Sequence, residues 1–166
     1  MELAQSDLDW KEYFMRHVYL AASKSKDPRT KIGAVLVKDG IIISEGFNGF
    51  ARGVVDRLDR YENKKEKYIF TVHGEANAVL NAVRHGINTQ GSTCYTQAIP
   101  CHDCTKMLIQ AGISRIIYHT LWPMNQKWIK SIEYSMLMLN EVGILYDGFD
   151  QKLNIFAKNN GRRIKV

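Results

Sequence analysis

HGEANAVLNAVRHG, residues 73–86, and PCHDCTKMLIQAG, residues 100–112, are the two stretches that decide the fold. In each of them apolar side chains recur three and four residues apart, and a glycine stands where a helix would end. Between them, residues 92–96 have the composition of a short strand. The pattern predicts two helices joined through a strand, with the N-terminus of one helix facing that of the other.

Further elements are predicted on both sides of these stretches. Before them come a helix over residues 10–21 and a β-hairpin of residues 32–37 and 41–46, whose strands are joined by the turn signal Asp-Gly. After them come a strand at 115–119, a helix at 129–139, a strand at 144–147 and a terminal hairpin within 153–166. Strands that alternate with helices predict an α/β sandwich.

The segment 48–70 shows little periodicity. We interpret it as a long loop with one charged helical stretch, and a loop of this length is usually functional or mobile. No linker or internal repeat divides the 166 residues. The chain is therefore expected to form a single domain, 1–166, with a core at about 8–147 and a C-terminal extension at 148–166.

Composition narrows the class of protein. The formal net charge of +6 and the pI near 9.2 favour an anionic substrate or partner, although a solvated basic surface explains them equally well. The N-terminus has no signal-peptide pattern, and no run of about 18 apolar residues occurs, so we expect a cytoplasmic protein that does not bind membranes. Three cysteines, two of them close together, favour metal binding over a disulfide framework.

The chemistry is expected at the starts of the two central helices. Cys101 and Cys104 are three positions apart, so their thiols share one helix face and can reach one ion. His73 adds a third donor, and a site with three protein ligands keeps a position open, as catalytic zinc sites do. Zinc lowers the pKa of water to about 7, and Glu75 stands where it could take up the proton.

Each of these residues also has a simpler interpretation. A lone Cys-x-x-Cys can be a redox pair or incidental, and Glu75 can be a carboxylate that stabilises a helix start. His102 or Cys94 could complete the metal site instead, but His102 points off the shared face and Cys94 fits a buried strand position.

The order of these motifs resembles a known family. HGEANAVL followed by PCHDC matches the H-x-E and P-C-x-x-C signature of zinc deaminases. Together with SKDPRTKIGAVLV and GFNGFARG, the likeness to the zinc-dependent cytidine and deoxycytidylate deaminase family, and most closely to its deoxycytidylate branch, covers about residues 13–147. The resemblance implies a three-layer α/β/α sandwich around a mixed five-stranded sheet.

The resemblance also implies an activity. The expected reaction is hydrolysis of dCMP to dUMP and ammonia by a zinc-activated hydroxide with Glu75 as proton shuttle, one Zn²⁺ being held by His73, Cys101 and Cys104. A homo-oligomer, most often a hexamer, and regulation by dCTP and dTTP, with Mg²⁺ accompanying an effector, are further expectations.

Four residues are expected to bind the substrate. Asn48 matches an asparagine that binds the sugar hydroxyl and base, Arg29 and Lys26 could reach the 5′-phosphate, and Trp122, or else Tyr118, could stack on the base. Asn48 could instead be a turn residue, and the two cations could be solvated loop charges. The chain departs from the family in Gly74, where alanine is usual, and in Ala51, where proline is common.

Other functions remain open at the level of sequence. The same signature serves deaminases of other cytosine nucleotides, such as CMP, dCTP or 5-substituted dCMP, and of nucleic-acid bases. The Asp-Pro-Arg-Thr loop and the long insert from Ala51 to Phe70 resemble the mononucleotide branch, so a nucleic-acid partner is not expected. A non-enzymatic zinc module that binds nucleic acid is the alternative from a different class.

Overall fold

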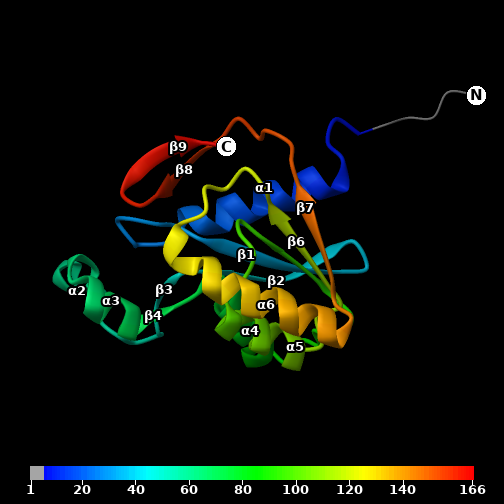
Figure 1. The fold of residues 1–166 in the computed structure, drawn as a ribbon, viewed down its shortest axis with the longest axis horizontal. Helices are drawn as coiled ribbons and strands as arrows, with labels where there is room; N and C mark the ends of the chain where they lie inside the picture. The colour runs from blue at the N-terminus through cyan, green and yellow to red at the C-terminus, as the bar shows by residue number, and fades with distance from the viewer. Residues whose placement is uncertain (1–5) are drawn as a thin grey trace, which may run out of the picture.

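A five-stranded mixed sheet separates two helical layers in the computed structural model, which describes residues 6–166 (Figure 1). Its strands lie in the order β2 (Ile41–Phe47), β1 (Gly33–Lys38), β5 (Thr93–Thr96), β6 (Arg115–His119) and β7 (Leu145–Phe149). β1 runs antiparallel to both β2 and β5, whereas β5, β6 and β7 are parallel. The predicted three-layer α/β/α sandwich with a mixed five-stranded sheet is confirmed.

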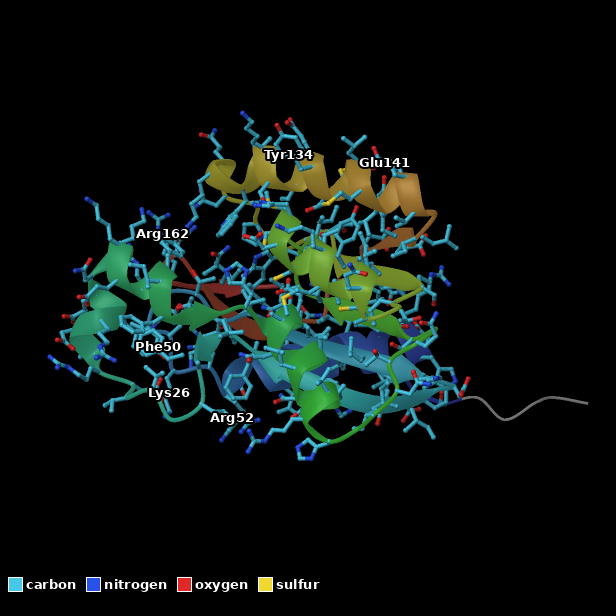
Figure 2. All side chains as sticks on the ribbon, turned by 90° about the horizontal axis from the view of Figure 1, so that it is seen from below. Lys26, Phe50, Arg52, Tyr134, Glu141 and Arg162 are labelled. Carbon is cyan, nitrogen blue, oxygen red and sulfur yellow. The ribbon has the colours of Figure 1, made fainter. Side chains whose placement is uncertain are left out.

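The helices cover the sheet unequally. α1 (Trp10–Ser23) lies on one face, and α4 (Gly74–Arg84), α5 (His102–Gln110) and α6 (Ile129–Val142) lie on the other (Figure 1). Figure 2 shows Tyr134 and Glu141 on the outer surface of α6, away from the sheet. Within residues 6–166, no helix combines the length and the apolar character needed to cross a membrane.

Alternation along the strands builds two separate cores. On β1, Val35 and Val37 pack with α1, whereas Ala34 and Leu36 pack with α4, and all four side chains are buried. This two-sided burial follows from the period of two along a strand that lies between helical layers. It explains why the strand is an uninterrupted apolar run in the sequence.

The turn between β1 and β2 is the one that the sequence predicts. Asp39 and Gly40 both have positive φ angles, 51° and 76°, as a two-residue type I′ turn requires. The turn therefore fixes the pairing of β1 with β2. Asn48, a candidate site residue, follows directly after β2.

Gly46 allows α4 to lie directly on β2. A Cβ atom added at this glycine would lie 2.2 Å from the backbone nitrogen of Ala78 and 2.4 Å from the carbonyl oxygen of Gly74. Both neighbours are backbone atoms of α4, so no side-chain rotation relieves the overlap. The contact matters for the site because α4 carries Glu75 near its N-terminus.

We therefore expect Gly46→Ala to lower the free energy of unfolding by about 3 kcal/mol, since overpacking against backbone forces the helix away from the sheet. Urea denaturation measures the change. Gly49→Ala is the matched control, because a Cβ atom there would meet nothing within 4 Å. Equal stability losses in the two variants would contradict the assigned close packing.

The segment 48–70 is more ordered than predicted. In place of a long loop with one helical stretch, it contains β3 (Gly49–Phe50), α2 (Leu58–Glu62) and α3 (Lys64–Phe70), and β3 pairs with β4 (Thr71–Val72). The two helices are too short to show a periodic apolar face. Phe50 stacks on Tyr61 with a ring separation of 4.1 Å, which holds α2 against the two-stranded sheet of β3 and β4. We call residues 51–70 the insert.

The end of the chain forms the predicted hairpin, with β8 (Phe156–Asn159) and β9 (Arg162–Lys165). Leu153 and Val166 are buried in the same core as α1. The hairpin also donates hydrogen bonds to the loop that follows α1, from Asn160 N to Thr30 Oγ1 at 3.0 Å and from Gly161 N to the Arg29 carbonyl at 2.7 Å. The C-terminal extension thus supports a loop of the candidate site.

Candidate active site

The three candidate metal ligands lie at the starts of α4 and α5. His73 is the N-cap residue of α4 and Cys101 that of α5, and neither side chain caps its own helix. Cys104 follows one turn into α5. Both helix N-termini therefore direct their positive ends at one place while leaving a nitrogen and two sulfur atoms free, an arrangement that favours thiolates.

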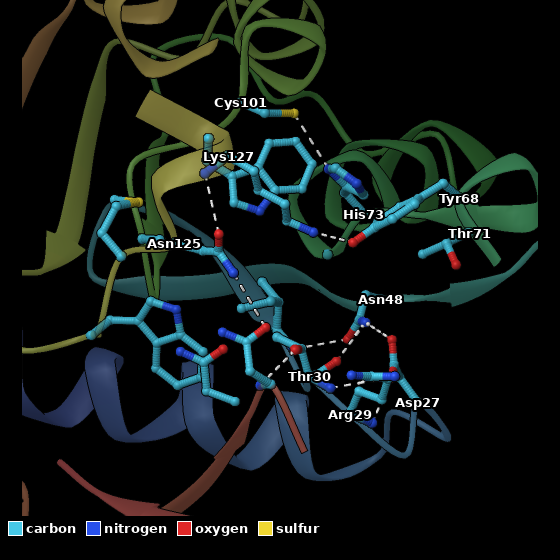
Figure 3. A pocket seen from close by; sticks show the side chains of 18 of the residues that line it. Asp27, Arg29, Thr30, Asn48, Tyr68, Thr71, His73, Cys101, Asn125 and Lys127 are labelled. Atoms are coloured by element: carbon cyan, nitrogen blue, oxygen red, sulfur yellow. Dashed lines mark hydrogen bonds between the residues drawn. The ribbon is translucent and has the colours of Figure 1, made fainter. Parts of the chain in front are cut away.

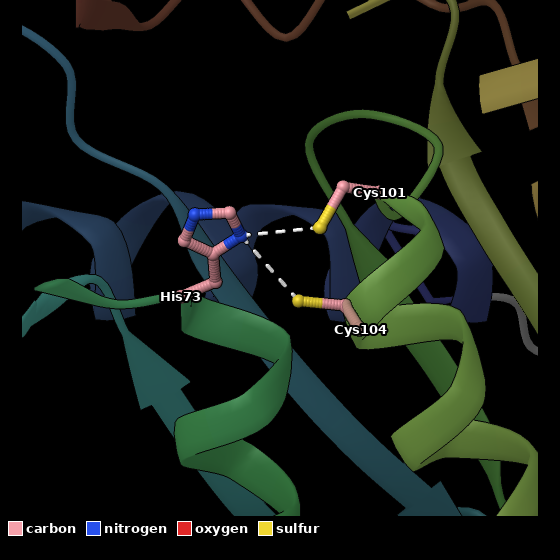
Figure 4. Close-up of side chains that lie close together, drawn as sticks. All are labelled: His73, Cys101 and Cys104. Atoms are coloured by element: carbon pink, nitrogen blue, oxygen red, sulfur yellow. Dashed lines mark hydrogen bonds between the residues drawn. The ribbon is translucent and has the colours of Figure 1, made fainter. Parts of the chain in front are cut away.

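The donor atoms are spaced as a metal ion requires (Figure 4). His73 Nδ1 lies 3.3 Å from Cys101 Sγ and 3.5 Å from Cys104 Sγ, and all three ligand atoms lie within 4.8 Å of one another. Tetrahedral zinc, with bonds of about 2.0 Å to nitrogen and about 2.3 Å to sulfur, separates such atoms by about 3.5 Å. The group fits a zinc ion in both donor type and spacing.

Neither alternative ligand joins this group. His102 Nδ1 lies 2.7 Å from Ser131 Oγ, so its ring is engaged on α6, and Cys94 is fully buried in the core beneath α4. Within residues 6–166, the cluster consists of three residues. Three protein donors leave a coordination position for water, which is typical of catalytic zinc sites.

Local electrostatics favour the ligand form of Cys101. A hydrogen bond from Cys104, helped by His73, lowers the pKa of the Cys101 thiol to about 4. The pKa of His73 is raised in turn, chiefly by its hydrogen bond with Cys101 and against the effect of burial. A thiolate is thus already favoured beside the histidine.

Glu75 lies beside the metal group but remains separate from it. Its side chain is 5% exposed, and Thr96 Oγ1 donates a hydrogen bond of 3.2 Å to Oε1. The other oxygen, Oε2, lies 3.7 Å from Cys104 Sγ. Burial raises the pKa of the Glu75 carboxyl, so that the group binds a proton more readily than an exposed glutamate. Such a carboxyl can both accept and return a proton.

A cavity extends from the metal ligands to the loop after α1 (Figure 3). His73, Cys101 and Glu75 line it at one side, and Arg29 and Thr30 line it at the other. Four cationic side chains contribute to its wall, namely Arg29, Lys64, Lys67 and Lys127. The cavity therefore combines the candidate metal ligands and a buried carboxyl with positive charge that suits an anionic ligand.

The predicted substrate-binding residues do not all reach this cavity. Arg29 and Asn48 line it, and Trp122 borders it while also packing against Tyr19 in the core, with a ring separation of 6.1 Å. Lys26 lies outside, where its ammonium group pairs with Asp56 at 2.6 Å on the molecular surface (Figure 2). Three of the four residues thus share the cavity with Glu75.

Several residues that line the cavity were missed by the sequence interpretation. The insert contributes Tyr68, and the 3₁₀ helix η1 (Gln126–Trp128) contributes Lys127 and Trp128. Lys127 Nζ donates a hydrogen bond to the Tyr68 hydroxyl across the cavity, and Trp128 meets the His73 ring edge-on at 5.8 Å. The signal available in the sequence was an aromatic residue directly after a lysine, in Lys67-Tyr68 and in Lys127-Trp128. Such pairs are also common on a solvated surface, so they do not by themselves indicate a binding site.

The unusual Gly74 has a structural reason. A Cβ atom at this position would lie 2.9 Å from the carbonyl oxygen of Ile32, just before β1. Backbone of the sheet thus approaches the start of α4 more closely than alanine allows. The departure from the family's usual alanine is therefore matched by local packing and removes no functional group.

Comparison with known proteins agrees with this site. A family model described as the cytidine and deoxycytidylate deaminase zinc-binding region matches residues 8–120. The human deoxycytidylate deaminase is 34% identical over 153 residues, which span 87% of this chain and 82% of that protein. A probable deoxycytidylate deaminase of Drosophila melanogaster is 35% identical over 152 residues, 84% of this chain and 71% of that protein.

Solved structures show the same fold. The crystal structure of dCMP deaminase from the cyanophage S-TIM5 in its apo form superposes with a TM-score of 0.65 at 27% identity, covering 84% of this chain and 96% of that chain. Fold and site together define a zinc-dependent hydrolytic deaminase. With more than half of its length matched by the family model, the chain belongs to the cytidine and deoxycytidylate deaminase family.

Proposed function

We propose that the protein hydrolyses dCMP to dUMP and ammonia. The observation that supports this most directly is that Glu75 and the metal ligands line the same cavity as cationic side chains such as Arg29 and Lys127. The human relative is named a deoxycytidylate deaminase, and the cyanophage enzyme has a crystal structure in complex with dCMP and dUMP. An anionic ligand with a cytosine base suits the positive charge of the cavity wall and agrees with the cytidine and deoxycytidylate deaminase family.

His73, Cys101 and Cys104 would hold the zinc ion in this proposal. Zinc bound there supplies Lewis acidity, which lets water lose a proton near neutral pH. The three residues fix the ion beside Glu75, because Cys104 contacts both His73 and the carboxylate.

Glu75 would move the protons of the reaction. Its carboxylate takes one proton from the attacking water, whose oxygen bonds to C4 of the base, and passes that proton to N3. It then takes the second proton from the new C4 hydroxyl and delivers it to the amino group as the C4–N bond breaks and C4=O forms. Water and dCMP thus give dUMP and ammonia without a further reactant. Thr96 donates to Oε1, whereas Oε2 lies beside Cys104 Sγ, so Oε2 is the oxygen nearer to the metal ligands and would carry out this exchange.

The remaining residues would bind the nucleotide. Arg29 and Lys127 would meet the 5′-phosphate, and Asn48 would meet the sugar hydroxyl. The ring of Trp122 or Trp128 would stack on the base. All five residues line the same cavity, which supports this assignment. Lys26 is left out of this assignment because its ammonium group pairs with Asp56 outside the cavity.

A spectroscopic deamination screen with zinc-loaded protein tests the substrate. The panel contains dCMP, CMP, dCTP, 5-methyl-dCMP, deoxycytidine and a cytosine-containing oligonucleotide. We expect dCMP to have a kcat/KM at least about tenfold above that of deoxycytidine, because only the nucleotide meets the cationic wall. Deamination of the oligonucleotide without activity on dCMP would contradict the proposal and favour a nucleic-acid deaminase.

Regulation and assembly are a separate part of the proposal and rest on the family resemblance alone. dCTP and dTTP would regulate the enzyme, Mg²⁺ would accompany the effector, and the chain would assemble into a homo-oligomer such as a hexamer. Repeating the dCMP assay with each triphosphate, with and without Mg²⁺, tests the first point, and light scattering tests the second. A cytoplasmic location likewise remains a prediction from the sequence.

A further inference from the structure

Asn48 is held in a fixed orientation by three hydrogen bonds. Its amide nitrogen donates to Asp27 Oδ2 at 3.2 Å and to the Thr30 carbonyl at 2.9 Å, and its Oδ1 accepts from Ile32 N at 2.8 Å. Because acceptors face one end and a donor faces the other, the network itself distinguishes the nitrogen from the oxygen. Both N–H groups are used, so only Oδ1 has capacity left for a ligand.

Asp27 is the centre of this network. Its Oδ1 accepts from the backbone nitrogens of Arg29 and Thr30 at 2.8 and 3.1 Å, and its Oδ2 is shared between Asn48 and Lys67 Nζ, the latter at 2.5 Å. The side chains of Asp27 and Lys67 are only 1% and 8% exposed. A buried carboxylate with this many donors has one stable position, and its hydrogen bond with Asn48 orients the amide of that residue.

Lys67 brings the insert into the network. It belongs to α3, whereas Asp27 lies in the loop after α1, so the buried ion pair joins two walls of the cavity. A buried ion pair costs desolvation energy and is therefore weak evidence for stability by itself. Its effect here is geometric, because it holds the carboxylate on which the amide of Asn48 depends.

We propose that Asp27 and Lys67 are positioning residues that make Asn48 a hydrogen-bond acceptor towards the substrate. This inference rests on the proposed function and extends it, because it assigns the insert a part in recognising the sugar hydroxyl. An acceptor-only Asn48 selects a ligand that presents a donor, such as that hydroxyl, and disfavours one that lacks it.

The chain contains its own control for this idea. Lys26 and Asp56 form a second ion pair between the same loop and the same insert, at 2.6 Å, but it is exposed and does not contact Asn48. Asp56→Asn removes that pair while leaving an oxygen for the Tyr61 hydroxyl, which donates to Asp56 at 2.9 Å. If the buried pair acted only by attaching the insert to the loop, loss of either ion pair would have the same effect on the kinetics.

The experiment measures kcat and KM for dCMP and for its 3′-deoxy analogue with zinc-loaded wild type, Lys67→Met, Lys67→Arg and Asp56→Asn. In the wild type, loss of the hydroxyl is expected to lower kcat/KM at least about tenfold. In Lys67→Met, KM for dCMP rises about tenfold, kcat stays within about threefold, and the two nucleotides become nearly equal substrates. Lys67→Arg restores most of the discrimination, and Asp56→Asn retains it.

Lys67→Met leaves Asp27 charged and buried, so the variant can fail to fold. The double variant Asp27→Asn/Lys67→Met removes both charges and turns an amide N–H₂ towards that of Asn48, which then loses its acceptor. Wild-type discrimination between the two nucleotides in any folded variant without the pair, or equal losses in Asp56→Asn, would overturn the inference. A wild-type protein without activity on dCMP would instead overturn the proposed function, and the inference with it.

Discussion

Glu75→Gln is expected to bind one zinc ion per chain and to lose turnover of its cytosine substrate by about 10²- to 10⁴-fold, the contribution of a general acid–base group. The amide has nearly the shape of the carboxylate and can still accept the hydrogen bond from Thr96, which lies 3.2 Å from Oε1. It cannot take up a proton at neutral pH. Steady-state ammonia release and metal analysis on the same sample measure the two quantities.

Asp103→Asn is the matched control for this prediction. Asp103 stands in the first turn of α5, as Glu75 stands in the first turn of α4, but its side chain is exposed and pairs with Lys106 at 2.7 Å. Its amide variant is expected to keep activity within about threefold, since exposed ion pairs contribute little. Full activity in Glu75→Gln would contradict the proton-transfer role assigned to this residue.

The sequence predicts best those features that depend on short spacing. Cys101 and Cys104 share a helix face because they are three residues apart, and the alternation of Val35 and Leu36 between two cores follows from the strand period. Because both helices carry metal ligands at their starts, the sequence also predicts that the N-termini of α4 and α5 face each other. Local rules therefore predicted the α/β class and the candidate metal group, whereas the three-layer arrangement was predicted from the family resemblance.

The walls of the cavity depend on contacts between distant segments, and the sequence predicts them poorly. Lys67 is buried where it pairs with Asp27 of the loop after α1, and no spacing rule connects these two residues. Lys127 likewise lines the cavity through a contact with a distant residue, Tyr68. Lys26 is close to Arg29 in sequence, but its side chain points away from the cavity and pairs with Asp56. Short helices such as α2 add to the difficulty, because five residues do not reveal a periodic face.

Cys104→Ala is expected to release the metal and to abolish turnover, with zinc content falling below about a tenth of an ion per chain. The variant leaves His73 and Cys101 as two donors, which hold zinc far more weakly than three. It is also expected to lower the melting temperature, because a metal that binds only the folded state stabilises it. Metal analysis, ammonia release and thermal denaturation measure these effects.

Cys94→Ala separates loss of a ligand from loss of a buried cysteine. The side chains of Cys94 and Cys104 are both buried, at 0% and 2% exposure, so each substitution removes a similar amount of packed sulfur. Only Cys104 belongs to the cluster of possible metal ligands among residues 6–166. Cys94→Ala should therefore keep about one zinc per chain and its activity, with only the cost of a small cavity, about 1 kcal/mol. Retention of zinc by Cys104→Ala, or its loss from Cys94→Ala, would require a different set of ligands.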